Sequence, residues 1–199
     1  MVLADEQAVR AVLGKYEGAI YEAVQAGWDE WRTLSLAGKL LFPARSRACL
    51  VYDFIVQRAI AAFAEDQKVR VLRGDETAKF LFADAVALRF KKANDNGLGS
   101  NIRTQATLGF VHQQQELPGL PNVHKVEVVY VLNSLQTQVD EVVVTARDGD
   151  VKIWNYSIAP DSTAAIIPMS PPVVPDSGHG ARIKIRGSED GEKTKANEK

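Results

Sequence analysis

The chain has 199 residues, of which 46% are hydrophobic and 25% are charged. These proportions are those of an ordinary globular domain, and they argue against a chain that is disordered, fibrous or membrane-embedded as a whole. The formal net charge is −1, from 24 basic and 25 acidic residues. Because no global field draws such a chain to nucleic acid or anionic lipid, any such site has to be a local patch.

The sequence also predicts a compartment and the extent of the folded part. The start of the chain lacks the basic and apolar regions of a secretory signal, and the single cysteine has no partner for an internal disulfide. We therefore expect a cytoplasmic protein without membrane association. We expect one α+β domain over residues 1–158. Residues 159–199, rich in proline and charge, are expected to form a disordered tail, because they contain too little apolar surface to offset the entropy of ordering.

The first helix is predicted from a stripe of apolar residues. They recur every three or four positions over residues 5–25, and Gly27 is expected to end the helix. Trp28 and Trp31 follow directly. Packing in the core is the favoured interpretation of these tryptophans, and a contact surface for a partner is the alternative, since tryptophan is common in both settings.

A second long helix is predicted over residues 44–64. Pro43 precedes it, and proline suits the first turn of a helix. Most of its positions are apolar, so we expect a largely buried helix with one polar edge. Cys49 lies within this apolar pattern and is expected to pack as a small hydrophobic residue.

Strands are predicted after residue 66, where the apolar pattern changes from a period of 3.6 to a period of 2. Residues 68–92 are expected to form two or three antiparallel strands. Residues 123–158 are expected to form a three-stranded meander, and Asp148 and Gly149 supply the Asp-Gly signal of its last hairpin.

A third helix is expected between these strands, over residues 102–115, with Ser100 or Asn101 as its N-cap. The predicted fold class is therefore α+β. N-terminal helices pack on a mainly antiparallel sheet of five or six strands, and one helix is inserted between the strands.

The candidate binding patch lies where a predicted strand ends, a glycine-containing loop follows and the third helix begins. Cations there supply charge for a phosphate, and unpaired amides at a helix start point toward an anion. The candidate binding residues are Arg89, Lys91, Lys92, Asn94, Asn101, Arg103 and Gln105, and the patch could extend to Arg70, Arg73 and Lys79. The competing interpretation is a solvated strand end, where lysines discourage pairing with other sheets.

The residues considered for a nuclease site do not have the expected spacing. A restriction-type nuclease needs an Asp followed by Glu-x-Lys or Asp-x-Lys on a strand; Glu76 and Lys79 are one residue too far apart for it, and neither Asp84 nor Glu127 has a lysine two places on. We expect no catalytic residue, no metal site and no cofactor, because Cys49 has no adjacent base and the histidines lack zinc-ligand spacing: His112, His124 and His179. The alternative is a divergent nuclease that uses Asp53, Asp75, Glu76 and Lys79.

Several short phrases, all within residues 45–158, resemble an uncharacterised bacterial protein family. Members of that family occur beside helix-turn-helix repressors and zinc-metallopeptidase-type regulators, in mobile-element or toxin–antitoxin-like gene clusters. The phrases contain no motif of known chemistry, so the resemblance assigns no catalytic residue. It implies a small bacterial accessory or regulatory protein. The phrases are Leu88-Arg89-Phe90-Lys91-Lys92, Asn101-Ile102-Arg103-Thr104-Gln105, Leu117-Pro118-Gly119-Leu120-Pro121 and Tyr130-Val131-Leu132-Asn133.

The expected function is that of a non-enzymatic regulatory or antitoxin-like accessory protein. It is expected to bind a partner protein or nucleic acid through the basic strand, loop and helix start described above. A divergent nuclease acting on DNA or RNA is the alternative.

Overall fold

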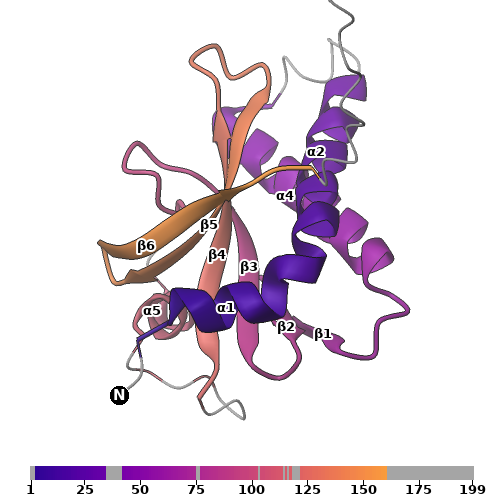
Figure 1. Ribbon diagram of the computed structural model, residues 1–199. Helices are drawn as coiled ribbons and strands as arrows, with labels where there is room; N and C mark the ends of the chain where they lie inside the picture. The colour runs from indigo at the N-terminus through magenta and orange to yellow at the C-terminus, as the bar shows by residue number, and fades with distance from the viewer. Residues whose placement is uncertain are drawn as a thin grey trace, which may run out of the picture. The chain divides into compact units, whose positions relative to one another are not determined.

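Five helical segments and one sheet make up the described part of the chain (Figure 1). The computed structural model describes residues 3–34, 42–74, 77–102, 104–113, 115, 117 and 122–160. The helical segments are α1 (Glu6–Leu13), η1 (Gly14–Tyr16), α2 (Glu17–Thr33), α4 (Ala44–Ala62) and α5 (Gln105–Val111). The strands are β1 (Val69–Arg73), β2 (Ala78–Phe82), β3 (Val86–Lys92), β4 (His124–Leu132), β5 (Val139–Asp148) and β6 (Val151–Ile158). The expected tail lies almost wholly outside the described residues.

The sheet has six strands in the order β1-β2-β3-β4-β5-β6. Every neighbouring pair is antiparallel except β3 and β4, which are parallel. A parallel pair needs a crossover connection, and the segment that contains α5 makes it. The prediction of N-terminal helices, a mainly antiparallel sheet and one inserted helix is therefore confirmed. None of the described helices has the length and apolar character needed to cross a bilayer.

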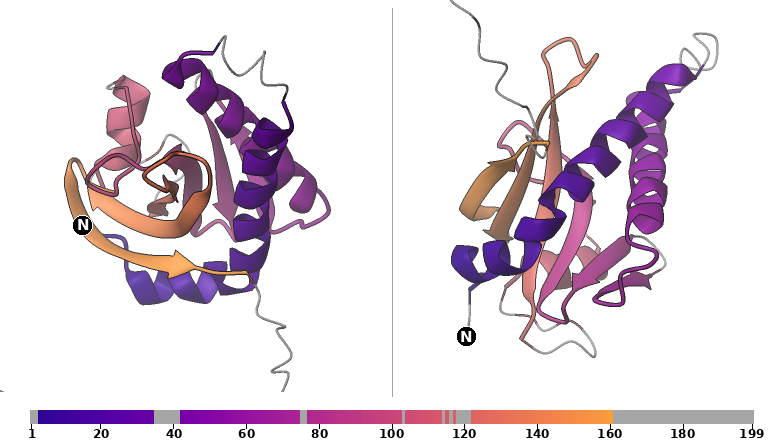
Figure 2. Two further views of the ribbon diagram at one scale, coloured as in Figure 1. Left: turned by 90° about the horizontal axis from the view of Figure 1, so that it is seen from above. Right: turned by 45° about the vertical axis from the view of Figure 1, so that its right-hand side comes forward.

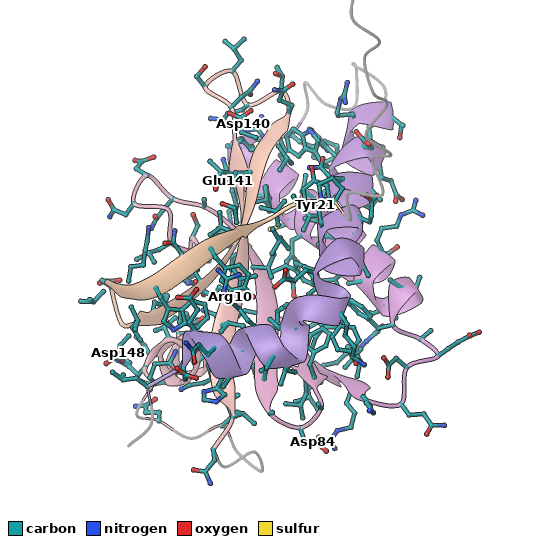
Figure 3. The ribbon with its side chains drawn as sticks, viewed as in Figure 1. Arg10, Tyr21, Asp84, Asp140, Glu141 and Asp148 are labelled. Carbon is teal, nitrogen blue, oxygen red and sulfur yellow. The ribbon has the colours of Figure 1, made fainter. Side chains whose placement is uncertain are left out.

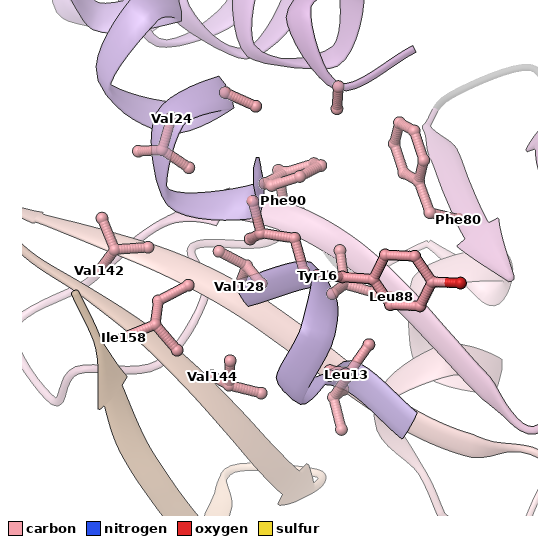
Figure 4. Close-up of a cluster of buried hydrophobic side chains, with 14 of the residues drawn as sticks. Leu13, Tyr16, Val24, Phe80, Leu88, Phe90, Val128, Val142, Val144 and Ile158 are labelled. Carbon is pink, nitrogen blue, oxygen red and sulfur yellow. The ribbon is translucent and has the colours of Figure 1, made fainter. Parts of the chain in front are cut away.

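The two faces of the sheet are covered by different helices (Figure 2). Helices α1, α2 and α4 cover one face and form the main apolar core with alternate residues of the strands (Figure 4). The core residues labelled there are Leu13, Tyr16, Val24, Phe80, Leu88, Phe90, Val128, Val142, Val144 and Ile158. Phe110 of α5 packs against Leu81 and Ala87 on the other face. The period of 2 in the strands produces this division, because successive side chains point to opposite faces.

Trp28 and Trp31 lie in the main core, with exposed fractions of 3% and 6%. The core interpretation of these tryptophans is thus confirmed. The expectation that Gly27 ends the helix is wrong, because α2 continues to Thr33. A Cβ atom at Gly27 would lie 2.6 Å from the backbone nitrogen of Ile55 on α4. Glycine is present because the two helices approach closely, which sequence spacing alone does not reveal.

The inserted helix is shorter than predicted. It spans Gln105–Val111, and Thr104 caps it by accepting a hydrogen bond from the Thr107 amide at 3.2 Å. The expectation of a cap at Ser100 or Asn101 is wrong, because the Asn101 side chain bonds instead to groups beneath the crossover.

Replacing Gly27 by Ala tests the close approach of α2 and α4. The added methyl group would overlap the Ile55 backbone, so the two helices have to move apart. We expect the free energy of unfolding to fall by about 1 to 3 kcal/mol, as measured by denaturant titration. Gly14→Ala is the matched control, because nothing lies within 4 Å of a Cβ there and alanine favours the helical backbone. Equal stability of the two variants would contradict this packing account.

Candidate anion-binding site

Strands β2 and β3 stop pairing with each other near one end of the sheet. Their pairing runs from Phe82 with Val86 to Phe80 with Leu88 and goes no further, although β2 continues to Ala78 beside β1. The Ala78 amide donates instead to the hydroxyl oxygen of Tyr52 on α4, at 2.8 Å. Strand β3 therefore ends between β4 on one side and helix α4 on the other.

A cavity of about 660 Å³ lies at this place. Its walls are α4, the ends of β3 and β4, and the crossover between residues 100 and 107. We call it the α4–β3 cavity. A volume of this size is within the usual range for sites that bind small ligands, roughly 300 to 1,000 Å³.

Positive charge gathers on the walls of the α4–β3 cavity. Arg45 is exposed at its edge, and Lys91 and Lys92 are half-buried. The lining residues that the structure describes include no Asp or Glu. Burial lowers the pKa of Lys92, and the nearby charge of Arg47 lowers it further, while Asp95 opposes the shift. The cavity thus holds cations in partly dehydrated positions, where an anion would relieve their mutual repulsion.

Neutral hydroxyl groups also line the cavity. Burial raises the pKa of the Tyr52 and Tyr130 phenols, so both keep their protons near neutral pH. The side chains of Thr104 and Thr107 also line it, and their hydroxyl groups are hydrogen-bonded to each other at 3.1 Å. The Tyr52 and Thr107 hydroxyl oxygens each accept a hydrogen bond, so their own protons can be donated to an anion without adding charge.

Cys49 is exposed and lines the cavity, so the expectation that it packs as a small hydrophobic residue is wrong. The buried residues of α4 include Val51, Ile55 and Ala59. Cys49 precedes Val51 by two residues, and two residues turn a helix by about 200°. It therefore lies on the side of the helix away from that buried stripe.

Arg89 does not lie on the surface, and the expectation that it contributes to an accessible patch is wrong. Its side chain is 1% exposed. Its Nε and Nη2 atoms donate to Glu127 Oε1 at 3.0 and 2.5 Å, and its guanidinium lies 4.2 Å from the centre of the Phe110 ring. Arg89 alternates with the core residues of β3, so it points to the opposite face, where α5 covers it.

The remaining candidate residues are divided between the cavity and the surrounding surface. Lys91, Lys92 and Asn101 line the cavity. Asn94 is exposed and accepts hydrogen bonds from two amides of its own loop. Gln105 is exposed and does not belong to the cavity lining. Arg103 lies outside the described residues.

The sequence analysis missed the buried ion cluster beneath the crossover, formed by Arg89, Asn101, Glu127 and Arg147; we call it the Glu127 cluster. Glu127 is 1% exposed, and its Oε2 atom lies 3.6 Å from Arg147 Nη1. Burial alone would raise the pKa of Glu127, but Arg89, Arg147 and a hydrogen bond from Asn101 outweigh it, so the pKa is lowered. The parallel register places Arg89 directly beside Glu127.

The Glu127 cluster also holds the wall of the cavity. Glu127 Oε2 accepts the Gly99 amide at 3.2 Å, and the Asn101 side chain donates to the Gly99 carbonyl oxygen at 2.9 Å. A Cβ atom at Gly99 would lie 2.5 Å from Glu127 Oε2, so only glycine fits without displacement. Arg89 and Asn101 therefore position the crossover from below.

Lys125 fixes the far end of the crossover. Its Nζ atom donates to the carbonyl oxygens of Gly109 at 3.0 Å and Gln115 at 2.6 Å, and to that of His112. These oxygens lie at the end of α5, where carbonyl groups lack helical partners. Burial lowers the pKa of Lys125 to about 8. This lysine serves the structure of the crossover rather than an accessible surface.

Two of the four residues proposed for a divergent nuclease lie outside the described residues, so this alternative stays a prediction. Asp53 is exposed on α4, and Asp75 and Glu76 lie outside the described residues. The described side chains include no group of three or more His, Cys, Asp or Glu placed to hold a metal ion. Figure 3 shows Asp84, Asp140 and Asp148 at separate places on the surface. Arg70 bonds to Asp84 at the β2–β3 turn, the end of β2 away from the cavity.

Replacing Glu127 by Gln tests the Glu127 cluster. The change leaves two buried guanidinium groups without a carboxylate. We expect the free energy of unfolding to fall by about 3 to 5 kcal/mol, as for other broken buried ion pairs. Glu141→Gln is the matched control, because Glu141 is an exposed glutamate on the neighbouring strand (Figure 3), and a loss of no more than about 0.5 kcal/mol is expected there.

The stability difference between the wild type and Glu127→Gln is also expected to depend on pH. The pKa of Glu127 is lower in the folded chain than its ordinary value of 4.5, so its ionised form stabilises the fold above that pH. This contribution disappears as the pH falls through the lowered pKa. The stability difference between the wild type and Glu127→Gln should therefore shrink in acid, and a constant difference from pH 7 to pH 2 would contradict the prediction.

Comparisons with known proteins give no further guide to this site. No protein-family model, no curated protein and no solved structure matches the chain. The resemblance to a bacterial family therefore stays a prediction, and the function has to be argued from the geometry of the cavity.

Proposed function

We propose that this protein is a non-enzymatic regulatory or antitoxin-like accessory protein that binds nucleic acid through the α4–β3 cavity. One observation carries the proposal. A chain with a net charge of −1 brings Arg45, Lys91 and Lys92 to one cavity whose described lining contains no carboxylate. Nucleic acid is the partner that such a local excess of cations suits best, because phosphate contacts supply most of its binding energy.

Two of the candidate binding residues have an indirect role in this proposal. Arg89 and Asn101 hold the cavity wall through Glu127, so we assign them positioning roles. Arg45, Lys91 and Lys92 are the proposed phosphate contacts. A partner protein with an acidic segment is the competing partner, and it is an outcome of the test below. No contact among the described residues favours the nuclease alternative.

Binding of a fluorescent single-stranded oligonucleotide, measured by anisotropy, tests the proposal. Lys92→Ala removes a charge-assisted contact, and we expect about tenfold weaker binding. The slope of log affinity against log salt should become shallower by about 0.7, the change expected for one phosphate contact on a single strand.

Lys68→Ala is the matched control, because Lys68 is exposed and lies outside the lining of the cavity. Its affinity and salt slope should equal those of the wild type, and thermal denaturation checks that both variants are folded. Equal affinities of Lys92→Ala and Lys68→Ala would overturn the proposed site. Cleavage of the oligonucleotide during the assay would contradict the non-enzymatic assignment.

A further inference from the structure

We propose that the α4–β3 cavity accepts one unpaired nucleotide that carries a terminal phosphate. In this arrangement the phosphate lies against Arg45 and Lys92, and the nucleoside lies against Tyr52 and Ile102. The inference rests on the proposed nucleic-acid binding and names the part of the nucleic acid that enters the cavity.

The first argument is the shape of the site. The cations line a cavity of about 660 Å³ rather than a flat surface or a protruding helix. A base in a duplex is stacked and shows only its edge in a groove, so it has to leave the stack before it can enter a protein pocket. Unpaired bases at the end of a strand pay no such cost. The cavity therefore favours a single strand over a duplex.

The second argument is the balance of charge. An internal phosphodiester carries one negative charge, whereas a terminal phosphate monoester carries about 1.5 to 2 at neutral pH. The described lining includes Arg45 and Lys92 and no carboxylate, and the charge of Arg47 also reaches Lys92. A monoester neutralises this group of cations more fully than a diester does.

The third argument is the apolar and aromatic part of the lining. Tyr52 is a half-buried aromatic side chain of the kind on which bases stack in single-strand binding proteins, whereas Tyr130 is 3% exposed and belongs to the main core. Ile102 also lines the cavity, although it is 68% exposed. A large aliphatic side chain left in solvent at a cavity edge gains stability when the planar face of a base covers it. An aromatic ring and an aliphatic side chain can contact a nucleoside, whereas inorganic phosphate has no apolar surface for them to contact.

The fourth argument is that the wall is held in place without a ligand. Gly99 and Asn101 are fixed from below by Glu127, and Thr104 and Thr107 bond to each other. A site whose wall is already ordered loses less entropy on binding. This order suits recognition of a small group such as one nucleotide.

The single cysteine of the chain provides the readout, because Cys49 is exposed and lines the cavity. The rate of its alkylation by iodoacetamide is measured on the full chain with five probes. They are adenosine 5′-monophosphate, one short single strand with a 5′-phosphate, the same strand with a 3′-phosphate, the same strand without a terminal phosphate, and a blunt duplex of that sequence.

We expect one of the phosphorylated single strands to slow alkylation at a concentration about tenfold lower than the unphosphorylated strand does. The mononucleotide should also slow it, at higher concentration, and the duplex should not. Ile102→Ala should weaken protection by the phosphorylated strand, whereas Leu135→Ala should leave it unchanged. Leu135 is the matched control because it is 78% exposed and is not part of the lining.

The outcomes separate this inference from the proposed function. Equal protection by the phosphorylated strand, the unphosphorylated strand and the duplex would overturn the terminal-nucleotide inference and leave nucleic-acid binding intact. Protection by the mononucleotide with no effect of any strand would overturn the proposed nucleic-acid binding. The absence of protection by every probe would overturn both.

Discussion

The Glu127 carboxylate connects three strands of the sheet and the crossover between two of them. It joins β4 to Arg89 on β3 and to Arg147 on β5, and it accepts a backbone amide from the crossover at Gly99. Burying a carboxylate and two guanidinium groups costs much of what their attraction returns, so apolar residues of similar volume could give equal stability. The ions instead fix the positions of the strands and of the crossover. Only one register of β3 against β4, and one path of the crossover, satisfies all of these bonds at once.

The parallel junction of β3 and β4 explains where the cavity lies. The chain leaves β3 and turns back over its end, so that the Ser100 amide donates to the Lys92 carbonyl oxygen at 2.8 Å. Meanwhile β2 stops pairing with β3 beyond Phe80, and there the Ala78 amide of β2 bonds to Tyr52 on α4. The cavity is thus enclosed by a helix, a strand end and a returning loop. Lys91 and Lys92 at the end of β3 therefore line it, although they are distant from α4 in the sequence.

Sequence reasoning found the features that depend on local pattern. Apolar alternation located the strands, and a stripe of apolar residues located α4 almost to its ends. The sequence-based expectations for Gly27, as a helix end, and for Arg89, as a surface cation, were wrong because the role of each depends on a residue distant in the chain. Gly27 is required by the close approach of Ile55 on another helix. Arg89 is paired with a glutamate 38 residues away. Such pairs follow from the parallel register and from helix packing, and the residue spacing of one sequence predicts neither the register nor the packing.

The competing interpretation of Lys91 and Lys92, a solvated strand end that resists pairing with other sheets, fits the structure less well than binding does. Lysines serve that purpose on edge strands. Beyond Leu88, β3 no longer pairs with β2, but Lys91 and Lys92 line the α4–β3 cavity there. Burial and the neighbouring Arg47 both disfavour the charge of Lys92, and Asp95 opposes them in part. An anion in the cavity would favour that charge further, which accords with the proposed ligand.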